Sequence, residues 1–269
     1  MCEGGWCRPQ TDGPGLRAMA VSKWGLILVG EGMADQAKTS AWPLVSYDME
    51  WVTENWAQSG CDLWEEFTSD DFYWNRMAFV YSLQTAADFA DAIGEDNFDL
   101  HFLNGFFLGE SSSASSYRSV ANEIVESAKG HFNGEYIYEC NGREKDGAVI
   151  HAIITFGEYL YPPTSSEAAS TIAAWNRAFC YEYPINQRDN AAGKPGILIG
   201  RYPGDSYAGG NPWQLLTAAH AEVFYLGASS WLDQVKRIGN MKTGEEHREW
   251  RDLLYLGIKM IMMIDSDIE

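Results

Sequence analysis

Apolar residues recur at helical spacing through most of the chain, and this pattern limits the possible folds more than any other feature. The clearest case has successive spacings of 3, 4, 3 and 4 and consists of Trp42, Val45, Met49, Val52 and Trp56. It predicts one amphipathic helix over residues 35–58, which Pro43 starts or kinks. Strand-like alternation is almost absent. We therefore expect an all-α fold whose chemistry lies in the loops.

The same pattern predicts a buried helix over residues 16–32 and further helices along the chain. These are expected over residues 72–93, 117–132, 146–156, 166–183, 213–235 and 244–264. A weak alternation predicts a short strand over residues 134–139. No linker or change in composition divides the chain, so we expect a single domain over residues 1–269.

Charge narrows the range of ligands. Thirty-eight acidic residues and nineteen basic ones give a formal net charge of −19, which opposes binding to nucleic acid or to an anionic membrane. A neutral or cationic ligand would tolerate this field. Eleven Trp, fourteen Tyr and twelve Phe fit either a Trp-rich core or flat, partly wet surfaces such as sugar-binding clefts. The sequence does not decide between these two interpretations.

The cysteines and histidines do not predict a metal site. The five cysteines are odd in number, contain no CxxC pair, and are Cys2, Cys7, Cys61, Cys140 and Cys180. They match neither a zinc site nor a complete disulfide framework, so most are expected to be buried thiols. The histidines show no ligand spacing. No apolar run has the ~18 residues of a membrane span, and no signal peptide is recognised at the printed N-terminus.

The candidate catalytic stretch is Cys61-Asp62-Leu63-Trp64-Glu65-Glu66-Phe67, a loop between two predicted helices. It holds three carboxylates around a tryptophan. A carboxyl group crowded by like charge and by an indole tends to keep its proton, and a protonated carboxyl can act as a general acid. The simpler interpretation is a solvated set of charges at the start of a helix.

Three separated motifs point in one direction. They are residues 5–14 (GWCRPQTDGP), residues 62–66 (DLWEE), and residues 201–207 (RYPGDSY) followed by GNPW at 210–213. Together, and in this order, they resemble the glucoamylases of glycoside hydrolase family 15 over Gly5 to Leu226. The resemblance implies a partial (α/α)6 barrel that acts as an exo-glycosidase. Such an enzyme releases glucose from the non-reducing ends of starch and maltooligosaccharides with inversion, as a secreted monomer without a cofactor.

The resemblance also implies roles for single residues. Glu65 corresponds to the general acid, and Asp62 corresponds to an aspartate often described as the proton acceptor. Asp62 and Glu65 are three residues apart, whereas an inverting pair stands about 6.5–9.5 Å apart across the sugar ring. We therefore expect Asp62 to tune the charge and orientation of Glu65. Residues expected to bind substrate are Trp6, Arg8, Trp64, Glu66 and Arg201. For Arg201, a structural ion pair with Asp205 is an equally good interpretation.

The chain also departs from the family pattern. Cys7 replaces a family glycine, Gly204 replaces an acidic residue, and the loop at 68–72 is altered. Neither the Trp-x-Arg-Asp segment that grips the terminal glucose nor the Glu-Gln motif that supplies the catalytic base is recognised. The sequence thus predicts a catalytic domain over 1–269 that is incomplete at both ends, without a starch-binding domain and with exposed apolar faces.

Two other functions remain open. Because no catalytic base is recognised, the chain could be a catalytically inactive carbohydrate-binding or regulatory relative. Another α/α-toroid glycosidase, such as a trehalase, is the third interpretation, and the combination of all three motifs counts against it.

Overall fold

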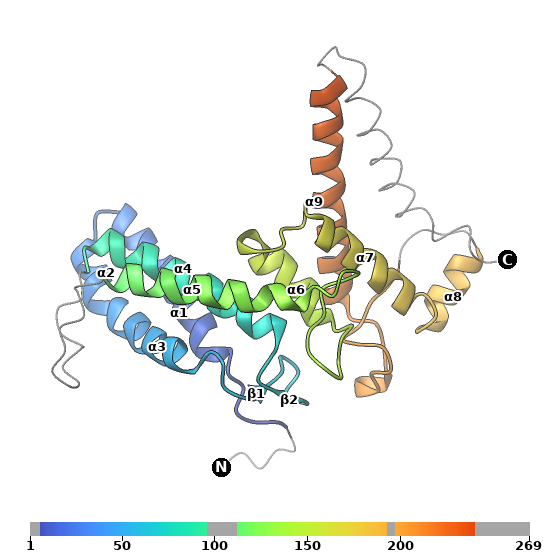
Figure 1. The fold of residues 1–269 in the computed structure, drawn as a ribbon, viewed down its shortest axis with the longest axis horizontal. Helices are drawn as coiled ribbons and strands as arrows, with labels where there is room; N and C mark the ends of the chain where they lie inside the picture. The colour runs from blue at the N-terminus through green and yellow to red at the C-terminus, as the bar shows by residue number, and fades with distance from the viewer. Residues whose placement is uncertain (1–5, 96–111, 193–196, 240–269) are drawn as a thin grey trace. The chain divides into compact units, whose positions relative to one another are not determined.

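The computed structural model describes residues 6–95, 112–192 and 197–239, and most of them are helical (Figure 1). The chain divides into two compact units between Gly130 and His131. The expectation of a single domain stays a prediction. No helix in the described ranges is both long enough and apolar enough to cross a membrane.

In the first unit, helices pack around the longest of them, α4. Its helices are α1 (Gly13–Gly30), α2 (Ala34–Ser40), α3 (Trp42–Asn55), α4 (Tyr73–Ile93) and α5 (Ser113–Ala128). α4 packs against α1, α3 and α5, and it buries residues on every side, including Met77, Val80 and Leu83. Burying each side chain of this size contributes about 1.5–3 kcal/mol. α4 is therefore the core element of the unit.

Close contact between α1 and α4 depends on one glycine. Gly25 of α1 faces the ring of Phe89 so closely that any β-carbon at position 25 would overlap the ring. Trp42, the first residue of α3, contacts the same ring edge-on, with 5.8 Å between ring centroids. Phe89 thus joins three helices.

The helix ends follow local chemistry. Pro14 and Pro43 are each the second residue of a helix, α1 and α3 respectively, where the missing proline N–H is not needed. The side-chain oxygen of Ser112 accepts a hydrogen bond from the Ser115 amide at the start of α5. Gly94 ends α4 with a φ of 66°, a left-handed conformation that glycine adopts without strain.

The second unit is built on α9. Its helices are α6 (Gly147–Phe156), α7 (Ser166–Phe179), α8 (Pro184–Ala191) and α9 (Gln214–Gly239). α6 and α7 both pack against α9, and their first turns are capped by the side chains of Asp146 and Ser165. Single 3-10 turns occur at Lys129–His131, Gly157–Tyr159 and Tyr207–Gly209.

Most of the expected helices are present, with shifted ends. The helix expected over residues 35–58 is in fact two, α2 and α3, because Ala41 interrupts it and a new helix begins at Trp42, with Pro43 as its second residue. The strand expected over residues 134–139 is wrong, since only an isolated bridge between Phe132 and Ile137 forms there. The helix expected over residues 244–264 lies outside the described residues.

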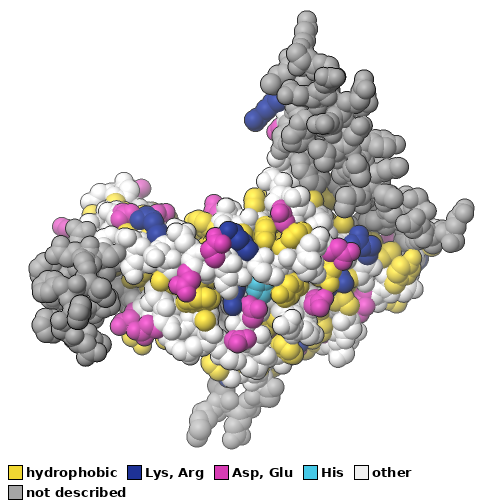
Figure 2. Space-filling model, viewed as in Figure 1, with side chains coloured by type: hydrophobic (Ala, Val, Ile, Leu, Met, Phe, Trp, Pro, Cys, Tyr) yellow, Lys and Arg dark blue, Asp and Glu magenta, His cyan; other side chains and the backbone are white. Residues whose placement is uncertain are grey.

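The helix expected to be buried over residues 16–32 corresponds to α1, and its burial was overestimated. Ile27 is 63% exposed and Trp24 is also exposed. Large exposed apolar side chains also occur on α9, where Leu215 and Tyr225 are exposed. On the face shown in Figure 2, apolar side chains lie interspersed with acidic ones. The expectation of exposed apolar faces stays a prediction.

Candidate active site

A two-stranded hairpin between α3 and α4 presents the candidate carboxylates. β1 (Gly60–Cys61) pairs antiparallel with β2 (Thr68–Ser69), in the register Gly60 to Ser69 and Cys61 to Thr68. Residues 62–67 form the turn between them. The Asp62 amide donates to the Phe67 carbonyl over 2.9 Å. The sequence indicated a loop here, but its short strands gave no alternating pattern that could be recognised.

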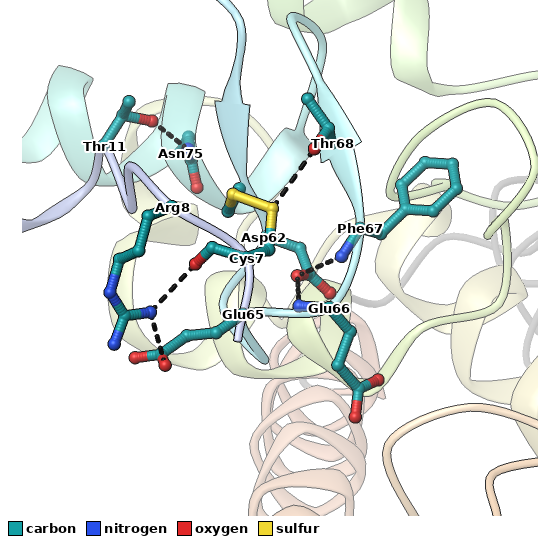
Figure 3. Close-up of a disulfide and its surroundings, with 10 residues drawn as sticks. Cys7, Arg8, Thr11, Asp62, Glu65, Glu66, Phe67, Thr68 and Asn75 are labelled. Atoms are coloured by element: carbon teal, nitrogen blue, oxygen red, sulfur yellow. Dashed lines mark hydrogen bonds and ion pairs between the residues drawn. A yellow bond between two sulfur atoms is a disulfide. The ribbon is translucent and has the colours of Figure 1, made fainter. Parts of the chain in front are cut away.

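Asp62 organises the turn from inside. Its side chain is 2% exposed, and its Oδ1 atom accepts hydrogen bonds from the amides of Glu66 over 2.7 Å and Phe67 over 2.9 Å. A carboxylate that accepts backbone N–H groups in this way fixes the path of the chain around it. Asp62 therefore stabilises the backbone conformation of the turn that contains Glu65 and Glu66 (Figure 3).

Glu65 adopts an unusual backbone conformation at the tip of the turn. Its φ is +62°, in the left-handed region that residues other than glycine seldom occupy. Such conformations persist where surrounding contacts impose them, and they are common at functional sites. The Glu65 amide donates to the Asp62 carbonyl over 3.0 Å, and the Glu65 carbonyl accepts from the Cys7 amide over 2.6 Å.

The carboxylate of Glu65 is partly open to solvent and is paired with Arg8. Its Oε2 atom lies 2.5 Å from Arg8 Nη1, and the side chains are 30% and 59% exposed, respectively. The same Arg8 nitrogen donates to the Cys7 carbonyl over 2.9 Å. As Figure 3 shows, the guanidinium lies beside the Glu65 carboxylate, while the Glu66 side chain points in a different direction.

A disulfide joins the two motifs that carry these residues. Cys7 and Cys61 are bonded, with 5.7 Å between their Cα atoms, so the expectation of buried thiols is wrong for this pair. It is confirmed for Cys140 and Cys180, which are buried and free. Cys2 lies outside the described residues. The signal for the missed bond was position, because Cys7 lies within the first site motif and Cys61 directly precedes the second.

A buried polar layer supports the hairpin, and the sequence interpretation did not single it out. Asp12 Oδ2 accepts from Trp74 Nε1 over 2.8 Å, and Thr11 Oγ1 accepts from Asn75 Nδ2 over 2.9 Å. Burial is the largest cause of a raised pKa at Asp12, the hydrogen bond from Trp74 opposes it, and the nearby charge of Glu65 adds a smaller increase. Gly60 lets the Thr11 side chain approach the hairpin, since a β-carbon at position 60 would overlap it.

The other predicted binding residues of the first unit lie on the same two segments. Trp6 is 44% exposed, and Trp64 and Glu66 are each partly exposed. Trp6 is bonded in sequence to Cys7, and Trp64 and Glu66 flank Glu65. The fold thus brings six of the seven predicted residues onto the hairpin and onto residues 6–10 beside it, where Gln10 forms an isolated bridge with Cys61.

Arg201 lies in the second unit, where it forms a buried ion pair. Its Nε and Nη2 atoms donate to the two carboxylate oxygens of Asp205 over 2.9 and 2.7 Å. Its guanidinium also lies 4.7 Å from the centre of the Tyr207 ring. Burial alone would raise the pKa of Asp205, but the hydrogen bonds from Arg201 lower it overall. This geometry supports the structural alternative for Arg201.

A metal site is not suggested by the described side chains. Within residues 6–95, 112–192 and 197–239, no three His, Cys, Asp or Glu side chains are grouped so that they could hold an ion.

Comparison with known proteins identifies the family. The family model for glycosyl hydrolases family 15 matches residues 2–243. Glucoamylase-1 of Schizophyllum commune is 32% identical over 240 residues, which is 85% of this chain and 38% of the relative. Glucoamylase P of Amorphotheca resinae is 33% identical over 246 residues, 85% of this chain and 36% of the relative.

A solved structure gives the same result for the fold. A family 15 glucoamylase from Hypocrea jecorina superimposes with a TM-score of 0.72 at 28% sequence identity, covering 86% of this chain and 38% of that protein. The described part is therefore an all-α portion of an (α/α)6 barrel. The chain spans less than half the length of these relatives. On the family match over residues 2–243, this chain belongs to glycosyl hydrolases family 15.

Proposed function

We propose that this chain carries the acid side of an exo-acting glycosidase that releases glucose from the non-reducing ends of starch and related α-1,4-glucans. The observation that carries the proposal is the position of the Glu65 carboxylate. It is partly exposed at the tip of a hairpin whose backbone is fixed by Asp62 and Cys7. The relatives named above are glucoamylases, and the reaction type is inferred from them.

In the proposed reaction Glu65 is the general acid. It gives its proton to the glycosidic oxygen as the bond to the anomeric carbon breaks, through an oxocarbenium-like transition state. Glu65 then carries a negative charge. The guanidinium of Arg8, 2.5 Å away, is placed to stabilise that charge as it develops.

Inversion needs a second carboxylate, which activates water on the opposite face of the ring. Asp62 is a poor candidate, since it is buried and its Oδ1 atom already accepts two backbone hydrogen bonds. We propose that Asp62 positions Glu65 and is not the base. We assign the base to no described residue of this chain.

The proposed substrate is a neutral sugar chain. Trp6 is 44% exposed, and an indole can stack on a pyranose ring. Arg8, Trp64 and Glu66 lie on the same two segments, where polar groups can form hydrogen bonds with sugar hydroxyls. A net charge of −19 does not oppose a neutral ligand, whereas it disfavours nucleic acid and anionic membranes. Figure 2 shows acidic side chains spread over the visible face.

The proposed location is outside the cell. A disulfide persists in oxidising compartments and is rare in the reducing cytosol, and Cys7 and Cys61 form one beside the site. We further infer that the protein is a monomer, as the family resemblance implies.

A second candidate function is carbohydrate binding without catalysis. It is favoured by a specific observation: Asp62, the aspartate that the resemblance would make the proton acceptor, is buried and accepts two backbone hydrogen bonds. Such a protein would keep the stacking and hydrogen-bonding groups of Trp6 and Arg8 and would release no glucose.

The test is to incubate the purified chain with maltose, maltotetraose and soluble starch and to measure free glucose. Glu65→Gln removes the proton donor, and we expect glucose release to fall at least a hundredfold. Glu126→Gln is the matched control, because Glu126 lies on the exposed side of α5, where it pairs with Lys129. Proton NMR of the fresh product should show β-glucose if the reaction inverts.

Two results would count against the proposal, the first against the role of Glu65 and the second against catalysis. Equal glucose release from the wild type and Glu65→Gln would exclude Glu65 as the acid. Absence of release from the wild type, together with calorimetric binding of maltotetraose, would favour the binding function.

A further inference from the structure

We propose that Cys7 and Cys61 are positioning residues whose disulfide holds Arg8 and the Glu65 turn in register, so that opening this bond lowers turnover in the folded protein. The inference rests on the proposed function. It concerns two cysteines that the sequence interpretation left as ordinary thiols, one of which stands where the family pattern has glycine.

The disulfide lies between the two segments that hold Arg8 and Glu65. Cys7 directly precedes Arg8, and Cys61 directly precedes Asp62, so the disulfide connects the segment of the arginine to the hairpin of the general acid (Figure 3). It joins residues 54 apart in sequence. No shorter covalent path connects Arg8 to Glu65.

The other contacts between the two segments are non-covalent, and they include the close approach of the Thr11 side chain to Gly60. The Cys7 amide donates to the Glu65 carbonyl over 2.6 Å, and the Cys61 amide donates to the Pro9 carbonyl over 2.8 Å. The ion pair of Arg8 and Glu65 is exposed to water, where such pairs are weak. Without the disulfide, only non-covalent interactions such as these would hold the register.

Catalysis is sensitive to small displacements. A shift of about 1 Å in a reacting group can reduce rate by about a hundredfold, and catalytic groups are held within about 0.5 Å of the productive geometry. Releasing Cys7 from Cys61 frees the backbone that bonds to the Glu65 carbonyl. The expected consequence is a poorly placed proton donor.

One of the two bonded residues is partly exposed, and we expect a small dithiol to reach the bond from that side. Cys61 is buried, whereas Cys7 is partly exposed and its sulfur accepts a hydrogen bond from the Thr68 hydroxyl over 3.1 Å, because a disulfide sulfur has no hydrogen to donate. A dithiol would attack Cys7 Sγ as thiolate, forming a mixed disulfide and releasing Cys61 as a thiolate. Its second thiol then displaces Cys7, so that the protein disulfide is reduced and the dithiol becomes a cyclic disulfide.

The experiment uses the full chain in a Cys2→Ser background, so that Cys2 cannot exchange with the bond. Three forms are compared: oxidised, reduced with dithiothreitol, and reduced and then bridged with dibromomethane, which places one methylene between the two sulfurs. The kcat and KM for maltotetraose are measured, together with amide hydrogen exchange of the peptide containing residues 61–67. The assay temperature is one at which circular dichroism shows that all three forms are folded.

We expect reduction to lower kcat at least fivefold with little change in KM, to accelerate exchange in residues 61–67, and to be reversed by reoxidation. The methylene-bridged form should keep its activity in dithiothreitol. Cys140→Ala and Cys180→Ala remove buried free thiols and should respond to the reductant as the parent does. Burial raises the pKa of the Cys140 thiol to about 12, which makes it unreactive.

Unchanged exchange, a kcat within fivefold of the oxidised form, or loss of activity when the bridged form meets dithiothreitol would each overturn the inference. If the oxidised protein releases no glucose, the proposed function fails. The exchange measurement then still decides whether the disulfide holds the Glu65 turn.

Discussion

Arg8 Nη1 lies 2.5 Å from Glu65 Oε2, although the two residues are 57 positions apart in the sequence. The arginine comes from the segment before α1, and the glutamate comes from the hairpin before α4. The contact therefore links the two segments through their charged groups, next to the disulfide that links them covalently.

Arg8→Met should separate the catalytic effect of this pair from its effect on stability. The pair is exposed, so its loss should lower the free energy of unfolding by less than about 1 kcal/mol. If Arg8 stabilises the charge left on Glu65, kcat should fall by roughly tenfold, which corresponds to about 1.4 kcal/mol in the transition state. Urea unfolding and initial rates on maltotetraose measure the two quantities.

The control for Arg8→Met is Arg118→Met. Arg118 forms an exposed ion pair with Asp88 that connects α5 to α4. Its replacement should leave kcat unchanged, and an equal loss in both variants would show that removing any surface arginine has this effect.

Asp62 can be tested by comparing amide and alanine replacements. Asp62→Asn keeps an oxygen that can accept from the Glu66 and Phe67 amides, so it should retain at least a tenth of wild-type kcat. Asp62→Ala leaves those amides buried without this acceptor, which should cost about 2–3 kcal/mol of unfolding free energy. Steady-state kinetics and urea unfolding check both expectations. A base role makes the opposite prediction, because Asp62→Asn would then be as inactive as Asp62→Ala.

The Cys7–Cys61 disulfide should also stabilise the chain. In the chain-entropy description, closing a loop of this length lowers the entropy of the unfolded state enough to contribute about 4 kcal/mol, given a separation of 54 residues. The double variant Cys7→Ser/Cys61→Ser should therefore lose stability of this order in urea unfolding. Dithiothreitol should destabilise the wild type by a similar amount and leave the double variant unaffected. A loss below about 1 kcal/mol would contradict the prediction.

His220 on α9 should make stability depend on pH. Its burial lowers the pKa from 6.5 to about 4, and a hydrogen bond with the Ile172 backbone opposes this shift. The unfolded chain binds the proton below pH 6.5 while the folded chain stays neutral until about pH 4. The contribution of His220 to the free energy of unfolding is therefore fully present above pH 6.5. It is lost as the pH falls toward 4, by about 3 kcal/mol in total.

His220→Gln removes this titration and keeps a side chain that can hydrogen-bond. Urea unfolding at pH 7.0 and pH 4.5 measures the effect as a difference between wild type and variant, because other groups titrate in both. The wild type should lose about 2–3 kcal/mol more than His220→Gln between the two pH values. Equal losses would show that the pKa of His220 is the same in the folded and the unfolded chain.

The helices that could be predicted are those with a dense apolar pattern. α4 carries apolar residues at helical spacing along its whole length, and it is the core of its unit. α8 (Pro184–Ala191) was missed because its sequence PINQRDNA is mainly polar and gives no such pattern. The break between α2 and α3 was missed because the apolar pattern begins only at Trp42, and residues 35–41 were joined to that helix without a pattern of their own.

The candidate site was predicted in part, since Glu65, Asp62 and Arg8 lie in motifs with a fixed order along the chain. The contacts between those motifs could not be predicted, because they depend on how α1 and α4 pack. The hydrogen bond between Asp12 and Trp74 spans 62 residues, and the disulfide spans 54. Spacing along the sequence carries no information about such distant pairs.

The disulfide also turns residues 7–61 into a closed covalent ring that contains α1, α2 and α3. Gly32 lies in the exposed turn between α1 and α2, a position where a protease could cut the backbone. A cut there would open the ring without releasing a fragment. In denaturing gel electrophoresis the nicked protein would run as one band without a reductant and as two bands after the disulfide was reduced. The piece that bears Trp6 and Arg8 would remain attached to the piece that bears Glu65.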